Sequence, residues 1–181
     1  RMAIESISLI PASASQLPSY AQYLQTAKAD GAAEIACEPL KIQAEDAILK
    51  SSPSLYPIND RTSPLSEPYH PSNITLNCIG GAAWKEPGAQ IIWEVTVPED
   101  GLYRIGLRFK QTAMRGLYAT RLLRINGETP FKEAADLRFE HAAGFQFQYL
   151  GAGSAAEGKT ENKEGFLFYL KKGANRISLE T

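Results

Sequence analysis

The stretch Gln90–Phe109, QIIWEVTVPEDGLYRIGLRF, decides the fold of this chain. Apolar and other side chains alternate on both sides of a Pro-Glu-Asp-Gly turn, which predicts two strands that each turn one face toward a core. The residues of these core faces are Ile91, Trp93, Val95 and Val97 before the turn, and Tyr103, Ile105, Leu107 and Phe109 after it. The stretch therefore predicts an antiparallel hairpin, with Arg104 and Arg108 on its other face, either solvated or paired with Glu94 across the hairpin.

Most of the chain beyond residue 40 has the same character of short strands separated by turns. Further strands are predicted in KIQAEDAILK (41–50), ITLNCI (74–79), TRLLRI (120–125), FQFQYL (145–150), GFLFYL (165–170) and NRISLE (175–180). Asn126-Gly127 predicts a tight turn, and the last two strands are expected to form a closing hairpin. Because the helices that parallel crossovers need are missing, we predict an all-β protein, an antiparallel jelly-roll β-sandwich spanning residues 41–181.

Residues 1–40 differ from this pattern and are expected to be a helical extension or linker. Tyr20, Tyr23 and Leu24 recur at helical spacing and Gly31 supplies a stop, so a short amphipathic helix is predicted. Its apolar stripe docks either on this domain or on a neighbouring part of a longer protein. The first residue is arginine and the last follows a strand, so we expect the chain to be a piece of a larger parent protein.

Composition excludes several classes of partner. The 181 residues include 19 basic and 20 acidic side chains, a formal net charge of -1, so no broad field attracts nucleic acid or an anionic membrane. No apolar run approaches the roughly 18 residues that span a bilayer. Cys37 and Cys78 lack zinc-ligand spacing and are expected to be two buried thiols, although sequence does not decide whether they form a disulfide.

A search for catalytic motifs finds none that carries chemistry. His70 and His141 lie outside any metal-binding or nucleophile motif and are expected to be solvated loop residues. The many carboxylates include no pair that spacing singles out as the acid and base of a glycoside hydrolase. We therefore expect a protein that is not an enzyme.

Four segments, in this order, resemble a known family. IQAEDAILKSS, GGAAWKEPGAQIIWEVTVPEDGLYRIGLRF, LLRINGE and FYLKKGANRISLE are similar to the galactose-binding-like β-sandwich of carbohydrate-binding modules, especially families 6 and 35. A narrower likeness links the AED segment, Asp60-Arg61 and the Trp84 region to a sandwich domain of large extracellular solute-binding proteins of bacterial carbohydrate transporters. The resemblance implies an extracellular or cell-surface setting and a role in carbohydrate uptake.

The resemblance also implies a structural calcium ion. In such modules, acidic residues of the first strand and a carboxylate at the end of the last strand often hold this ion, and Glu45 and Glu180 occupy matching positions. Carboxylate oxygens are ligands that calcium prefers. Gln43 stands where many relatives have glutamate, which removes one charge from the set.

Sugar recognition in this family combines aromatic rings with polar groups on loops. Aromatic faces stack on the apolar faces of pyranose rings, while arginine and acidic groups bind the hydroxyls. The candidate residues for stacking are Trp84, Tyr69 and Tyr118, and the candidates for reading hydroxyls or a carboxylate are Asp60, Arg61 and Arg115. Trp84 has an alternative interpretation as a cap on the core.

These observations lead to one principal hypothesis of function. The chain is expected to be a non-catalytic domain that binds a glycan or oligosaccharide as part of a larger extracellular protein. The alternative is a structural or protein-interaction module of a transporter-associated solute-binding protein, with no sugar site of its own. A hydrolase is a more distant third.

Overall fold

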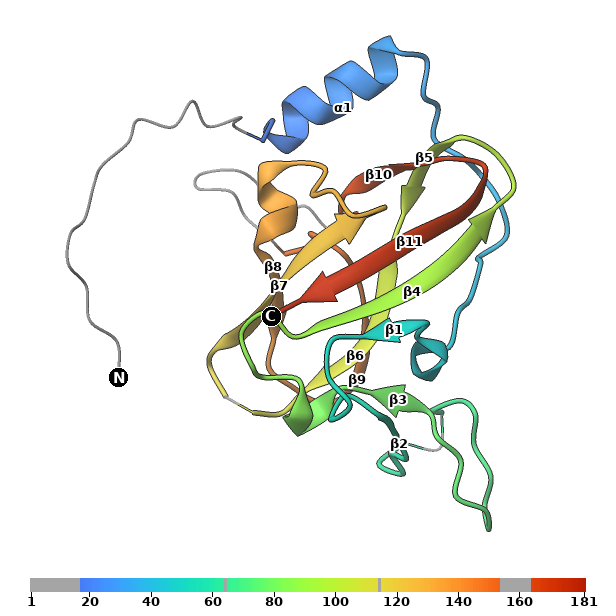
Figure 1. Ribbon diagram of the computed structural model, residues 1–181, viewed down its shortest axis with the longest axis vertical. Helices are drawn as coiled ribbons and strands as arrows, with labels where there is room; N and C mark the ends of the chain where they lie inside the picture. Colours follow the sequence, from blue (N-terminus) through green and yellow to red (C-terminus); the bar gives the residue numbers. More distant parts are fainter. Residues whose placement is uncertain (1–16, 64, 114, 154–163) are drawn as a thin grey trace, which may run out of the picture.

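The computed structural model describes residues 17–63, 65–113, 115–153 and 164–181 (Figure 1). One layer of the fold is an antiparallel five-stranded sheet. In spatial order its strands are β1 (Leu49–Lys50), β4 (Gln90–Val97), β11 (Gly173–Glu180), β7 (Tyr118–Ile125) and β8 (Leu137–Glu140). The central strand β11 pairs along its whole length with β4, from Gly173 opposite Val97 to Glu180 opposite Gln90.

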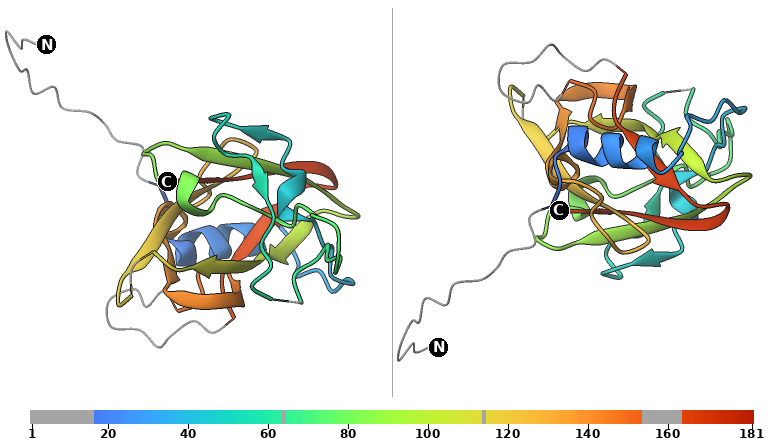
Figure 2. Two further views of the ribbon diagram at one scale, coloured as in Figure 1. Left: turned by 90° about the horizontal axis from the view of Figure 1, so that it is seen from below. Right: turned by 90° about the horizontal axis from the view of Figure 1, so that it is seen from above.

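The second layer consists of two antiparallel strand pairs. In the first pair β10 (Leu167–Leu170) lies beside β5 (Gly101–Arg104), and in the second β6 (Gly106–Gln111) lies beside β9 (Ala142–Tyr149). The remaining elements are a small β2–β3 ladder (Pro57–Ile58 and Cys78–Ile79) and 3-10 turns at Ala44–Asp46, Gly81–Ala83 and Lys132–Ala135. Figure 2 shows the two layers edge on. The predicted all-β sandwich with a short N-terminal helix is confirmed.

The hydrophobic core lies between the layers. Its buried side chains come from both of them and include Val97, Leu123, Leu137, Phe139 and Leu179 on one side and Tyr103, Leu150, Phe166, Phe168 and Leu170 on the other. Phe131, from the segment after β7, is fully buried in the same cluster. The predicted inward faces of Gln90–Phe109 are confirmed. All residues that were assigned to these faces, except Ile91, belong to this core cluster or pack on it. Ile91 is buried in a smaller cluster with Leu55.

The predicted hairpin pairing within Gln90–Phe109 is wrong. β4 pairs with β11 and β1, while β5 pairs with β10, so the turn at residues 98–100 carries the chain from one layer to the other. Glu94 accordingly forms its ion pair with Arg176 of β11, and not with Arg104 or Arg108. The prediction that the last two strands form a hairpin is also wrong, because β10 and β11 lie in different layers.

Two smaller expectations also need correction. Of the predicted strand 41–50 only β1 is extended, because Ala44–Asp46 form a 3-10 turn whose Ala44 carbonyl accepts a hydrogen bond from the indole of Trp93 at 2.7 Å. Both cysteines are free thiols, but Cys37 is exposed rather than buried, and Cys78 is half-buried. The Asn126-Gly127 turn is confirmed, with φ of 53° and 91° in the left-handed region.

Helix α1 (Tyr20–Ala29) docks on the sandwich. Ser19 caps its first turn, exchanging hydrogen bonds with Gln22, and Gly31 follows its end with φ of 87°. The hydroxyls of Tyr20 and Tyr23 accept hydrogen bonds from the β10 backbone at 3.1 and 2.7 Å, and burial raises the pKa of both phenols. The helix therefore covers the edge of β10, as Figure 2 also shows.

The segment after the helix pairs with the second layer too. Leu102 of β5 donates its amide to the carbonyl of Ala33 at 2.8 Å and accepts from Ile35 at 3.1 Å. Residues 20–35 thus contact the strand pair β10–β5 through side chains and backbone, whereas residues 1–16 lie outside the described residues. The boundary at residue 40 stays a prediction. No described helix is long and apolar enough to cross a membrane.

Candidate functional site

Strand β9 exposes Phe147 and Tyr149 on one face, and its two glutamines lie on the other face, where Gln148 is half-buried and Gln146 stays exposed. Gln148 lies opposite Leu107, and Gln146 lies opposite Phe109, in the antiparallel register with β6. Leu107 and Phe109 pack on the core, and directly opposite residues share one face of a sheet, so the two glutamines are on the core side. Gln148 meets its hydrogen-bonding need there by donating to the Ala152 carbonyl at 2.7 Å.

The outer face of this strand pair consequently carries the aromatic rings. We call it the aromatic platform and define it by Gly106, Arg108 and Lys110 of β6 and Phe145, Phe147 and Tyr149 of β9. The side chains of Phe147 and Tyr149 are 62% and 39% exposed. Large exposed aromatic residues on an outer sheet face, with the half-buried Gln148 amide on the core side, reverse the usual arrangement of a half-buried strand. Such a surface is typical of a binding site.

The rings of the platform have a defined arrangement. Phe147 and Tyr149 meet edge to face, with centroids 5.1 Å apart and planes at 83°. The ring of Phe147 lies over Gly106, where a Cβ atom would overlap it. Gly106 therefore leaves space that Phe147 occupies, and the exposed surface of that ring lies across the β6 backbone.

Two cations adjoin the third ring. The ammonium of Lys110 lies 5.0 Å and the guanidinium of Arg108 lies 6.0 Å from the ring centroid of Phe145. A register shift between Phe109 and Gln111 marks an irregularity in the ladder at Lys110. Arg108 is exposed and makes no hydrogen bond or ion pair with the described residues, so its guanidinium remains available to a ligand.

Asp60, one of the predicted ligand-binding residues, contacts the edge of the platform. Its carboxylate accepts hydrogen bonds from Lys110 and from the Thr62 amide, the latter at 2.8 Å. Burial acts to raise the pKa of this carboxyl, but the hydrogen bonds from Lys110 and Thr62 outweigh it and hold the pKa below its ordinary value. The Asn77 side chain bonds both backbone groups of Asp60, at 2.8 and 2.9 Å. Asp60 therefore anchors its loop to β6.

Trp84 is partly covered by the protein itself. Its indole donates to the Ala89 carbonyl at 2.9 Å, and the guanidinium of Arg121 lies 4.3 Å from its ring centroid. Arg121 also donates to the Trp84 carbonyl at 3.1 Å, and burial lowers the pKa of this guanidinium. The ring packs against both apolar clusters, as the alternative interpretation of Trp84 as a core cap predicts.

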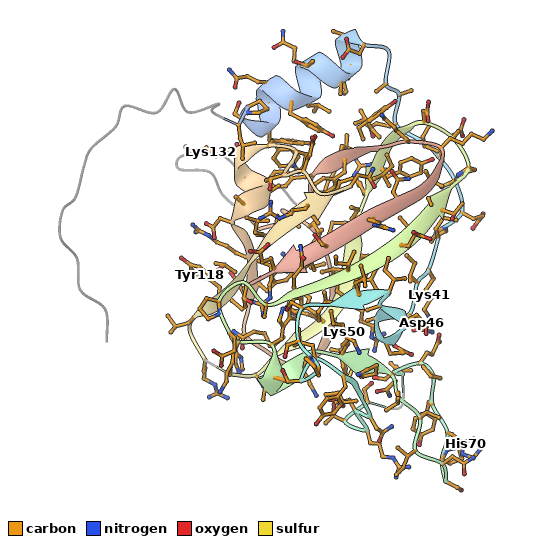
Figure 3. All side chains as sticks on the ribbon, viewed as in Figure 1. Lys41, Asp46, Lys50, His70, Tyr118 and Lys132 are labelled. Carbon is orange, nitrogen blue, oxygen red and sulfur yellow. The ribbon has the colours of Figure 1, made fainter. Side chains whose placement is uncertain are left out.

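The other predicted sugar-contact residues are exposed but not gathered into one site. Tyr118 begins β7, where Arg138 covers its ring at 4.8 Å, and Arg115 lies in the loop before it. Arg61 donates to the Asn73 carbonyl at 3.1 Å in the long proline-rich loop, which also carries Tyr69. Figure 3 places His70, the neighbour of Tyr69, at the tip of that loop and far from Tyr118. A role for these residues in binding stays a prediction.

The two predicted calcium ligands have different surroundings. The Glu180 carboxylate accepts hydrogen bonds from Arg124 on the neighbouring strand at 3.2 and 3.3 Å. Glu45 lines a cavity of about 430 Å³ with Gln43 and Asp46, and its buried Oε2 has no hydrogen-bond partner in the described part of the chain. Among the described residues no three His, Cys, Asp or Glu side chains group as metal ligands. One orphaned oxygen suits a cation, and calcium binding at Glu45 and Glu180 stays a prediction.

The Glu45→Gln variant tests this carboxyl directly. Burial raises the pKa of Glu45, so its contribution to stability is present at low pH and is lost as pH rises through the folded-state pKa. The melting temperature of the variant minus that of the unaltered protein should therefore increase from pH 4 to pH 7. A flat difference would contradict the assignment. Calcium binding at Glu45 requires that calcium stabilise the unaltered protein at pH 7 more than the variant.

The aromatic platform is the part of the site that sequence reasoning missed. FQFQYL was recognised as an alternating strand, but alternation alone does not say which face is inward. The available signal was the alternation of aromatic residues with glutamines. In such a strand, either the glutamines face the core and their amides need buried hydrogen-bond partners, or the aromatic rings face the core and the glutamines face solvent. A second signal is Gly106, a residue without a side chain opposite Tyr149. It is recognised only once the pairing of β6 with β9 is known.

Comparisons with known proteins identify the fold. No protein-family model and no curated protein matches the chain. A cycloisomaltooligosaccharide glucanotransferase from Paenibacillus sp., solved in complex with cycloisomaltoheptaose, superposes with a TM-score of 0.54 at 20% identity. That match covers 91% of this chain, which spans only 21% of the glucanotransferase.

Two further solved structures are similar at lower scores. A family 35 carbohydrate-binding module from Clostridium thermocellum has a TM-score of 0.48 at 16% identity, over 80% of this chain and 86% of the module. The GH26-CBM35 β-(1,4)-mannanase of Podospora anserina has a TM-score of 0.49 at 14% identity, over 77% of this chain and 23% of the enzyme. Likeness at such identities extends to the fold alone, and the β-sandwich predicted from the sequence is confirmed by the match to the glucanotransferase.

Proposed function

We propose that this domain binds a carbohydrate on the aromatic platform. The observation that carries the proposal is the polarity of β9, which exposes Phe147 and Tyr149 beside Arg108, whose guanidinium makes no hydrogen bond or ion pair with the other described residues. Exposed rings stack on the apolar faces of sugar rings, and arginine supplies hydrogen-bond donors for oxygen atoms at the ring edge. Fold analogy gives weaker support, because one fold hosts many functions.

Binding in this mode needs no catalytic group. Stacking removes apolar area of the ring and of the sugar from water, and Arg108 adds hydrogen bonds at the side. Lys110 is already held by Asp60, so its part is to fix Phe145 and the proline-rich loop at one end of the platform. The result is a surface whose rings are held in place before a ligand arrives.

The setting of the domain is part of the proposal. The resemblance of the sequence to modules of larger extracellular proteins supports attachment to a parent protein at the cell surface and a role in carbohydrate uptake. Calcium at Glu45 and sugar contacts from Trp84, Tyr69, Tyr118, Arg61 or Arg115 remain predictions of the same resemblance.

A second candidate function is docking on another part of a parent protein. Exposed apolar side chains in the proline-rich loop favour it, since Leu65 and Ile74 are 72% and 79% exposed. These residues lie in the segment between β2 and β3 rather than on the platform.

Affinity electrophoresis tests the principal proposal. The domain is run in native gels that contain dextran, glucomannan, xylan or polygalacturonate, with a non-binding protein as the mobility standard. We expect retardation in at least one gel, reversed by the matching soluble oligosaccharide. Unchanged mobility in all four gels would overturn carbohydrate binding and leave docking as the function.

A further inference from the structure

The spacing of the aromatic rings favours a ligand longer than one sugar. Phe145, Phe147 and Tyr149 occupy alternate positions on one face of β9. At about 3.3 Å per residue, these three positions span roughly 13 Å along the strand. A single pyranose ring is shorter than this, so a ligand that contacts the whole platform runs along β9 over more than one residue.

The platform also lacks the enclosure that recognition of a glycan end requires. Gly106 contributes no side chain to its surface, and Lys110 is occupied by Asp60 and Thr62. Two platform groups are polar and unbonded to other described residues, the Arg108 guanidinium and the Tyr149 hydroxyl. A terminal sugar is usually read by several converging polar groups in a concave site. An open face with two such groups fits the interior of a glycan chain.

The angle between the rings of Phe147 and Tyr149 indicates which conformation of a glycan chain fits them. Phe147 and Tyr149 are turned 83° from each other, so a flat ribbon that lies on one ring meets the other at its edge. A chain whose successive sugars are turned relative to each other can place one sugar against each ring. Rings in this arrangement do not match a flat crystalline surface.

We infer that the aromatic platform takes the interior of a soluble, twisted glycan chain, laid along β9 across Gly106. The inference rests on the proposed function and adds the class of ligand to it. It also makes Gly106 a positioning residue, because the absence of a Cβ lets Phe147 lie over β6 with its ring exposed. An alanine at this position displaces that ring from its place over the strand.

Gly144 offers a matched control for Gly106. Both glycines lie in the β6–β9 pair and both have ordinary strand φ, but a Cβ at Gly144 meets no atom within 4 Å. Gly106→Ala is expected to weaken binding about tenfold, and Gly144→Ala less than about twofold. In a Phe147→Ala background, Gly106→Ala should have no further effect, because its action passes through that ring.

The experiment measures affinity by titration calorimetry with oligosaccharides of one to six sugars, prepared from whichever polysaccharide retards the domain. We expect affinity to rise at least about tenfold from the monosaccharide to the tetrasaccharide, with no retention on microcrystalline cellulose. Three results would each overturn this inference and leave the proposed function standing. They are equal affinity for the monosaccharide and the tetrasaccharide, retention on microcrystalline cellulose, and equal affinities of folded Gly106→Ala and Gly144→Ala. Length dependence needs only the unaltered protein, so the test survives if Gly106→Ala does not fold. Failure of the proposed function is distinct, since no polysaccharide then retards the domain.

Discussion

Replacement of Phe131 by alanine is expected to lower the free energy of unfolding by about 3–5 kcal/mol, the typical cost of emptying a fully buried phenylalanine site. The side chain is 0% exposed. Its ring centroid lies 5.0 Å from both Tyr20 and Tyr23 of helix α1, and 5.1 and 5.6 Å from Phe166 and Phe168. The variant therefore loses core packing and the contact by which the helix is held.

Urea unfolding followed by tryptophan fluorescence and far-ultraviolet circular dichroism measures this effect. At the size of this domain, the expected loss corresponds to a fall in melting temperature of roughly 10 °C. Phe147→Ala is the control, because the same chemical change on the exposed platform should cost less than about 1 kcal/mol. Similar losses in the two variants would contradict the burial that distinguishes them.

Local patterns predicted the faces of the strands but not their partners. Alternation in Gln90–Phe109 correctly assigned the residues that pack on the core, since it depends only on the two-residue period of a strand. The turn after β4 was also recognised, yet a reversal of direction is compatible with a hairpin and with a crossing between layers. β4 pairs with β11, which lies about eighty residues later, and no local signal reports such a pairing.

The candidate site illustrates the same limit at the level of single residues. Asp60 and Trp84 were singled out because acidic and aromatic loop residues suit sugars, but their surroundings come from distant strands: Lys110 holds the first and Arg121 covers the second. The platform was missed because its polarity follows from the register of β9 against β6. Only that register shows that the glutamines share a face with Leu107 and Phe109, and that Phe147 and Tyr149 lie on the outer face.

The double variant Phe147→Ala/Tyr149→Ala is expected to abolish glycan binding while the domain stays folded. Removal of both exposed rings eliminates the stacking surface, and residues that dominate a binding site each cost about 2 kcal/mol or more when truncated. Two such losses weaken binding by roughly a thousandfold, which is below detection for an ordinary protein–sugar complex. The melting temperature should change little, because these side chains are 62% and 39% exposed.

The same titrations, run on two further variants, decide where the glycan binds. Leu49→Ala removes another exposed apolar side chain, on β1 at the edge of the five-stranded sheet, and should leave affinity unchanged. Tyr118→Ala removes a ring that the sequence predicts as a sugar contact but that the structure places on β7, beneath Arg138. If Tyr118→Ala abolished binding and the double variant did not, the ligand would lie on the loops beside the five-stranded sheet. The opposite result assigns it to β9, where Phe147 and Tyr149 are exposed and Gln148 lies on the core side of the strand.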